Sequence, residues 1–161
     1  MKITVVAGGN STERDVSLVS GTGVYRALKE KGHQVILLDV YLGVEYDDLD
    51  VIFDDKRDWA EGMKAVSEKN PTMEELKALK QGDTDFFGKN VCEICKRSDM
   101  VFMALHGANG EDGRIQAAFD LMGIKYTGTD YLSSAICMDK AITKEYFLMG
   151  NVPTPKSVTV Y

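Results

Sequence analysis

Apolar residues along the chain fall into two kinds of pattern, short continuous runs and longer stretches with helical spacing. The short runs are rich in β-branched residues, which is typical of buried strands. These predicted strands cover residues 3–7, 34–40, 100–105 and 124–127. The run at 100–105 is almost uniformly apolar, as expected for a strand at the centre of a parallel sheet.

The first helical pattern follows a break at residues 8–11. Thr12 and Asp15 have the spacing of a capping box, which predicts a helix that begins near Glu13. Gly32 is expected to end it. Its apolar face is expected to consist of Val16, Val19, Val24 and Leu28. The chain therefore opens with a strand, a glycine turn and a helix.

Helical spacing recurs after the second strand. The predicted helices cover residues 90–98, 115–122, 131–138 and 140–149. Strands that alternate with helices indicate the α/β fold class, with a doubly wound parallel sheet of Rossmann type. In such sheets ligands bind beyond the carboxyl ends of the strands.

Residues 41–90 depart from this alternation and are predicted to form a helical insertion. Asp58 with Glu61, and Thr72 with Glu75, have the spacing of helix N-caps. Two short helices are expected here, lying over an edge of the sheet. Their apolar stripes would be Trp59, Met63 and Val66 in the first, and Met73, Leu76 and Leu79, closed by Gly82, in the second.

The last residues differ from the rest in composition. Pro153 and Pro155 are typical of a linker. Residues 157–161 read as a strand with nothing after it, so we expect the chain to be truncated.

Length and composition are those of one globular domain with a possible appendage: 161 residues, 44% hydrophobic and 27% charged. No apolar run approaches the length of a membrane span, and the start lacks the form of a signal peptide. The sequence therefore predicts a cytoplasmic protein without a membrane partner.

The net charge of −6 is concentrated in one stretch. Residues 45–61 hold eight acidic side chains against Lys56 and Arg57, which accounts for the whole imbalance. This distribution argues against nucleic acid as a main partner. The spacing matches no EF-hand loop, so a solvated face is the favoured interpretation.

Three cysteines, an odd number, fit a reducing compartment. Cys92 and Cys95 form a C-x-x-C pair, but the pair lies within a helical pattern and no second pair completes a zinc site. Core packing is the favoured interpretation.

Two polar loops follow predicted strands and carry the candidate chemistry. The turn at residues 8–11 matches neither the dinucleotide fingerprint nor the P-loop, and leads instead to Glu13. Glu13 is either a first-turn acid favoured by the helix dipole or an anion that holds a ligand ammonium group.

The second loop, residues 106–113, begins with His106. A lone histidine is often satisfied by backbone carbonyls, and no nearby Ser or Cys suggests a hydrolytic triad. Yet Glu13, His106 and Glu111 are all expected at the carboxyl edge of neighbouring strands, where a small zwitterion could bind.

Four segments, in order, resemble the motifs of the D-alanine–D-alanine ligase family. Residues 7–17, AGGNSTERDVS, resemble its opening motif, and residues 104–113, ALHGANGEDG, resemble the second. Residues 126–130, YTGTD, and 138–140, MDK, resemble the third and fourth. Together these four segments are distributed over nearly the whole chain outside residues 41–90.

The resemblance implies the N-terminal, substrate-binding part of an ATP-grasp ligase of peptidoglycan precursor synthesis. In that family ATP phosphorylates the carboxylate of one D-alanine, the amine of a second attacks the acyl phosphate, and magnesium bridges the phosphates. It implies a Rossmann-like pre-ATP-grasp domain at residues 1–139. Residues 140–161 would be a linker helix and the first strand of a truncated central domain.

The resemblance also implies roles for individual residues. Glu13 would anchor the ammonium group of the first D-alanine, Val16 and Gly107 would belong to the same subsite, and His106 would orient Glu13. Lys140 would reach the ATP phosphates. No metal ligand is assigned, because most ligands of ATP and magnesium would lie outside this chain. The isolated chain is therefore expected to be inactive, and a homodimer is implied.

Three alternatives stay open. A related ligase could join D-alanine to D-lactate or D-serine, a choice that these motifs do not discriminate. A non-catalytic binding or dimerisation module is a second possibility. A nucleotide-binding oxidoreductase is the third, and it is disfavoured by the missing fingerprint.

Overall fold

A three-stranded parallel sheet lies at the centre of the computed structural model, which describes residues 1–61, 63, 72–80 and 85–160. The strands are β1 (Lys2–Ala7), β2 (Gln34–Asp39) and β3 (Met100–Met103), in the order β2-β1-β3. Ile3 of β1 pairs with Val35 on one side and Met100 on the other. The predicted α/β class and parallel sheet are confirmed.

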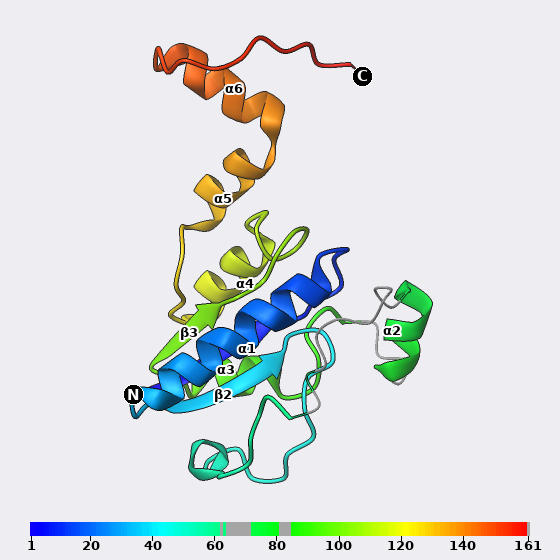
Figure 1. The fold of residues 1–161 in the computed structure, drawn as a ribbon, viewed down its shortest axis with the longest axis vertical. Helices are drawn as coiled ribbons and strands as arrows, with labels where there is room; N and C mark the ends of the chain where they lie inside the picture. The colour runs from blue at the N-terminus through cyan, green and yellow to red at the C-terminus, as the bar shows by residue number, and fades with distance from the viewer. Residues whose placement is uncertain (62, 64–71, 81–84, 161) are drawn as a thin grey trace.

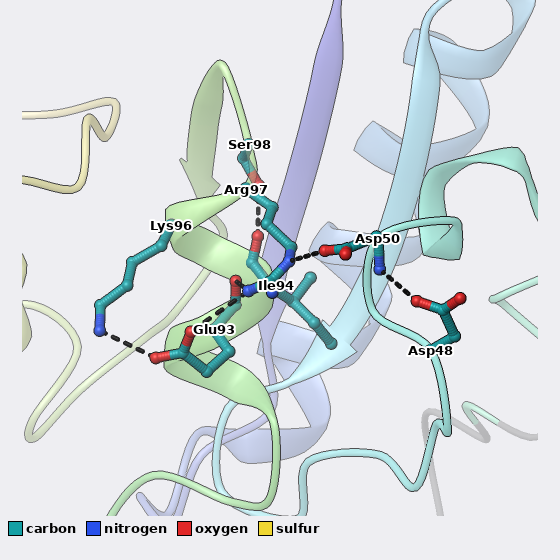
Figure 2. Close-up of polar contacts among 7 residues, drawn as sticks. All are labelled: Asp48, Asp50, Glu93, Ile94, Lys96, Arg97 and Ser98. Atoms are coloured by element: carbon teal, nitrogen blue, oxygen red, sulfur yellow. Dashed lines mark hydrogen bonds and ion pairs between the residues drawn. The ribbon is translucent and has the colours of Figure 1, made fainter.

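The sheet is buried on both faces because helices cover each of them. Helix α1 (Arg14–Glu30) packs against β1 and β2. Helix α3 (Val91–Lys96) lies on the opposite side of the sheet from α1 (Figures 1 and 2). Apolar side chains on both faces of β1 are consequently buried, and Val5, Val6 and Ala7 are fully inaccessible to solvent.

The predicted apolar face of α1 is wrong in its first half. Val16 and Val19 are 56% and 50% exposed, while Val24 and Leu28 are partly buried. The buried positions are instead Arg14, Ser17, Leu18, Gly21 and Tyr25, and the helix lies very close to the sheet at Gly21. The predicted capping box is also wrong: Glu13 is the N-cap, without a side-chain cap bond, and the Ser11 hydroxyl accepts the Glu13 N–H.

Gly21 is the point of closest approach between α1 and the sheet, and it supplies a test of this packing. A methyl group at Gly21 would lie 2.6 Å from Cβ of Ala7 and 3.2 Å from Cδ1 of Leu37. Gly21→Ala is therefore expected to lower the free energy of unfolding by about 1–3 kcal/mol, although alanine favours helix. Urea unfolding measures the change.

Gly23 provides the matched control in the same helix, since a methyl group there meets nothing within 4 Å. Gly23→Ala should stabilise the protein by up to about 1 kcal/mol. Equal effects of the two substitutions would contradict the close approach at Gly21.

The predicted fourth strand, residues 124–127, is reduced to one parallel bridge between Val101 and Tyr126. Lys125 O accepts the Val101 N–H and Val101 O accepts the Thr127 N–H, at 2.8 and 2.9 Å. At the next position the Thr127 hydroxyl, not a backbone carbonyl, accepts the Met103 N–H at 3.1 Å. The side chain thus ends the ladder before a strand forms.

The predicted insertion is only partly helical where the structure describes it. A 3₁₀ turn, η1 (Ile52–Asp54), lies beside the β2 edge, and helix α2 covers Met73–Leu79. The capping box of Thr72 and Glu75 is confirmed, with bonds of 3.2 and 2.7 Å.

The helix predicted from Asp58 is wrong over its described residues. Residues 58–61 form a turn in which Asp58 accepts the Ala60 N–H, and Trp59 packs into the core. Val66 and Gly82 lie outside the described residues.

The acidic stretch is solvated, as predicted: of its eight acidic residues only Asp55 is not classed as exposed. Figure 2 shows how part of it is fixed to α3. Arg97 Nε donates to Asp50 at 3.2 Å, and Asp48 accepts the Asp50 N–H at 3.0 Å. Such exposed pairs contribute little stability.

The C-x-x-C pair packs into the core, which confirms the prediction. Cys95 is buried in α3 beside Val91 and Ile94, and Cys92 is half-buried. Burial raises the pKa of both thiols, which disfavours the reactive thiolate form.

Three helices complete the chain: α4 (Arg114–Met122), α5 (Tyr131–Met138) and α6 (Lys140–Met149). Asp130 and Asp139 cap α5 and α6 through their side chains. Helices α5 and α6 extend away from the sheet (Figure 1), and α6 has no buried residue.

The strand predicted at the end of the chain is wrong over residues 157–160, which have no regular secondary structure. A strand needs a hydrogen-bonding neighbour, and within the described ranges no segment pairs with this one. Tyr161 lies outside the described residues. No described helix combines the length and apolarity that a membrane span requires.

Candidate functional site

The loop after β1 is held by a buried arginine. Arg14, the first residue of α1, donates through one guanidinium nitrogen to Gly9 O at 2.6 Å and forms an ion pair with Asp39 through the other. Asp39, at the end of β2, also accepts the N–H groups of Tyr41 and Leu42 at 2.9 and 3.0 Å. One buried pair therefore joins the loop, the helix and the end of β2.

Ser17 performs a similar structural task one turn along α1. Its hydroxyl accepts the Gly8 N–H at 2.9 Å and donates to Ala104 O at 2.6 Å. Since this hydroxyl is fully buried and satisfied, it joins the two strand ends and is not available to a ligand.

The loop after β3 folds back on itself through its own side chains. The Glu111 carboxylate accepts the Gly107 N–H at 2.6 Å, and the Asp112 carboxylate accepts the Asn109 N–H at 2.9 Å. Gly107 and Asn109 have φ angles of 72° and 68°, in the left-handed region that glycine and asparagine tolerate best.

Two hydrogen bonds join the two loops, and a third joins the second loop to α1. The Ser11 hydroxyl donates to His106 O at 2.7 Å, and the Asn109 amide donates to Asn10 at 2.9 Å. The His106 ring, through Nε2, lies 3.1 Å from the Ser20 hydroxyl on α1. The predicted meeting of the loops at one edge of the sheet is therefore observed.

The Glu13 side chain lies close to the backbone of the second loop at Gly107. A methyl group at Gly107 would lie 2.7 Å from Oε2 of Glu13. The Glu13 side chain is exposed, and no hydrogen bond or ion pair engages its carboxylate within the described part of the chain. Val16, one turn further along α1, is also exposed. The site thus presents an anion beside a backbone surface and an apolar side chain.

The third and fourth motif segments lie next to this edge. Burial and a 3.0 Å hydrogen bond to Asp120 raise the pKa of Tyr126 to about 12, so the phenol stays protonated at neutral pH. The Ser133 N–H, which donates to Asp130, lowers the pKa of that carboxylate. A cavity of about 400 Å³ lies between the second loop, α4 and α5.

Lys140 is not brought into contact with the two loops. It is the exposed first residue of α6, beyond α5, and forms no hydrogen bond or ion pair with another described residue. The described residues also contain no cluster of three or more His, Cys, Asp or Glu side chains that could hold a metal ion.

Comparison with known proteins identifies the family of this chain. The family model described as the D-Ala–D-Ala ligase N-terminus matches residues 2–129. The chain belongs to this family. It is 43% identical over 157 residues to the D-alanine–D-alanine ligase of Lacticaseibacillus casei, covering 96% of this chain and 43% of the relative.

Two further proteins give the same picture. The D-alanine–D-alanine ligase of Pediococcus pentosaceus is 42% identical over 167 residues, and the alignment covers all of this chain and 46% of that ligase. The crystal structure of the Bacillus anthracis ligase complexed with ATP superposes with a TM-score of 0.60 at 27% identity, covering 97% of this chain and 38% of that one. The chain thus spans less than half the length of these relatives.

Several residues that build the site were missed by sequence reasoning. Asp39 as the partner of Arg14, and Ser11 and Ser20 as the partners of His106, join segments separated by 25 to 95 positions. An aspartate at the end of an apolar strand was the available signal for the first pair.

Proposed function

We propose that the two loops form the first-substrate site of an ATP-dependent ligase that joins D-alanine to D-alanine. The observation that carries this proposal is the position of Glu13, whose exposed carboxylate lies against Gly107 where two strand ends meet. An ammonium group is bound best by a fixed anion, through charge-assisted hydrogen bonds. Membership of the ligase family supports the choice of D-alanine as the ligand.

The other residues of the site have positioning or lining roles in this proposal. Val16 provides an apolar wall for the methyl group of D-alanine, and Gly107 lets the ligand and Glu13 approach the backbone. His106 is a positioning residue: its backbone carbonyl binds Ser11 and its ring binds Ser20, which fixes the second loop to α1.

The finer parts of the function rest on the family alone. ATP binding is supported by the ATP complex of the Bacillus anthracis relative, and Lys140 is proposed as a phosphate contact. Residues 1–139 are proposed as the N-terminal domain and 140–161 as the start of the next, which agrees with the uncovered surface of α6. A cytoplasmic location and a homodimer complete the proposal.

Calorimetric titration with D-alanine tests the role of Glu13. The chain is expected to bind D-alanine saturably, and Glu13→Gln is expected to weaken binding by about tenfold or more, because a hydrogen bond to a charged group contributes about 1.5–3 kcal/mol. Glu30→Gln, at the exposed far end of the same helix, is the matched control and should bind like the unaltered chain. If Glu13→Gln binds D-alanine as tightly as the control, the proposal fails.

A further inference from the structure

A buried cation without a hydrogen-bond partner among the described residues lies beside Tyr41, in the segment that the family resemblance leaves unexplained. Lys80 follows the last residue of α2 and is 7% exposed. Among the described residues none accepts a hydrogen bond from its Nζ. Lysine is almost never buried to this degree unless it is paired.

Within the part of the chain that the structure describes, this ammonium group contacts an aromatic ring. Nζ lies 4.6 Å from the centroid of the buried Tyr41 ring. The face of a ring attracts a cation but leaves its three N–H donors without oxygen acceptors. The site is therefore electrostatically incomplete, and an anion would complete it.

A cavity of about 480 Å³ lies beside Lys80, large enough for a small molecule. Its other described lining residues are 42–45, Leu79 and Lys89. Two lysines face one acid here, Glu45, which pairs with Lys89 at 2.7 Å where both side chains are largely exposed. The whole chain has a net charge of −6, whereas the charged side chains that line this cavity carry more positive than negative charge.

The wall of the cavity is rigid because two backbone segments cross there. Gly43 bridges to Lys89, and the Val44 N–H donates to Lys89 O at 3.0 Å. The Gly43 N–H is used by Asp39 O at 2.8 Å. These two backbone donors are occupied, whereas Lys80 Nζ has no acceptor among the described residues and can bind a ligand.

We propose that this cavity binds a small molecule through a phosphate or carboxylate group, with Lys80 Nζ as the principal donor and Lys89 at the rim. The shared chemistry of the ligand is an oxyanion that accepts several hydrogen bonds. The inference is independent of the ligase proposal, because none of the lining residues belongs to the two loops.

Titration of the chain with inorganic phosphate, acetate and chloride at matched ionic strength tests this site. Amide resonances of residues 42–45 and 89, followed by NMR, are expected to shift saturably with phosphate, with acetate, or with both, and not with chloride. The oxyanion that binds with the higher affinity, phosphate or acetate, identifies the ligand class. A response equal to that of chloride, or shifts outside this segment, would overturn the proposal.

Lys80→Met keeps most of the apolar stem and removes the charge, and Lys77→Met, at an exposed position of the same helix, is the matched control. Oxyanion affinity is expected to fall about tenfold in the first and to stay unchanged in the second. Equal affinity in both variants would refute the role of Lys80. If Lys80→Met does not fold, the location of the shifts in the unaltered chain decides the matter. D-alanine binding should be the same in both variants, so this test and that of Glu13 are separate.

Discussion

Replacing Arg14 by methionine is expected to lower the free energy of unfolding by about 3–5 kcal/mol, the usual cost of removing one partner of a buried ion pair. The side chains of Arg14 and Asp39 are 7% and 5% exposed, so water cannot replace the lost guanidinium. Gly9 O also loses its donor. Urea unfolding followed by circular dichroism measures the change.

The Arg14 prediction has a matched control in Arg26, an exposed arginine of the same helix. Arg26→Met should change the free energy of unfolding by no more than about 0.5 kcal/mol. The Asp39 carboxylate keeps the N–H groups of Tyr41 and Leu42 in the Arg14 variant, which favours the lower end of the expected range. A loss below about 1 kcal/mol would mean that these backbone donors satisfy Asp39 without the arginine.

Gly107→Ala is expected to damage both stability and D-alanine binding. The φ angle of 72° places alanine in a strained backbone region, which costs of order 1–3 kcal/mol. The added methyl group would lie 2.7 Å from Oε2 of Glu13 and displace the carboxylate that is proposed to hold the ammonium group. We expect D-alanine affinity to fall by about a hundredfold, near 2.7 kcal/mol.

Gly123→Ala separates these two effects. Gly123 has a similar φ of 67°, but a methyl group there meets nothing within 4 Å. This control should show the backbone strain in urea unfolding and bind D-alanine normally in calorimetry. Unaltered D-alanine binding by Gly107→Ala would show that Glu13 binds the ammonium group without lying against the second loop.

The sequence predicted most of the secondary structure, because local rules decide it. The capping box at Thr72 and the aspartate caps of α5 and α6 involve residues no more than three apart. The same local rule misplaced the cap of α1: Glu13, not Thr12, is the N-cap, and the Glu13 N–H donates to the Ser11 hydroxyl.

Errors in the predicted burial have a common origin in tertiary contact. Hydrophobicity placed Val16 and Val19 inward, but α1 approaches the sheet through Gly21 and Ser17, and the valines face outward. The predicted fourth strand likewise ended when the Thr127 hydroxyl replaced a backbone acceptor. Neither event depends on residues that are neighbours in sequence.

The amino-acid sequence by itself determined the α/β class, the parallel order implied by alternating strands and helices, and the two loops that carry Glu13 and His106. These features follow from periodicity, caps and glycine positions, which act over a few residues. Only the tertiary structure decided that Arg14 pairs with Asp39, that Glu13 lies against Gly107, and that Lys80 is buried with no acceptor in the described ranges. Each of these depends on how segments distant in sequence pack, and burial then fixes the strength of the electrostatic interactions between them.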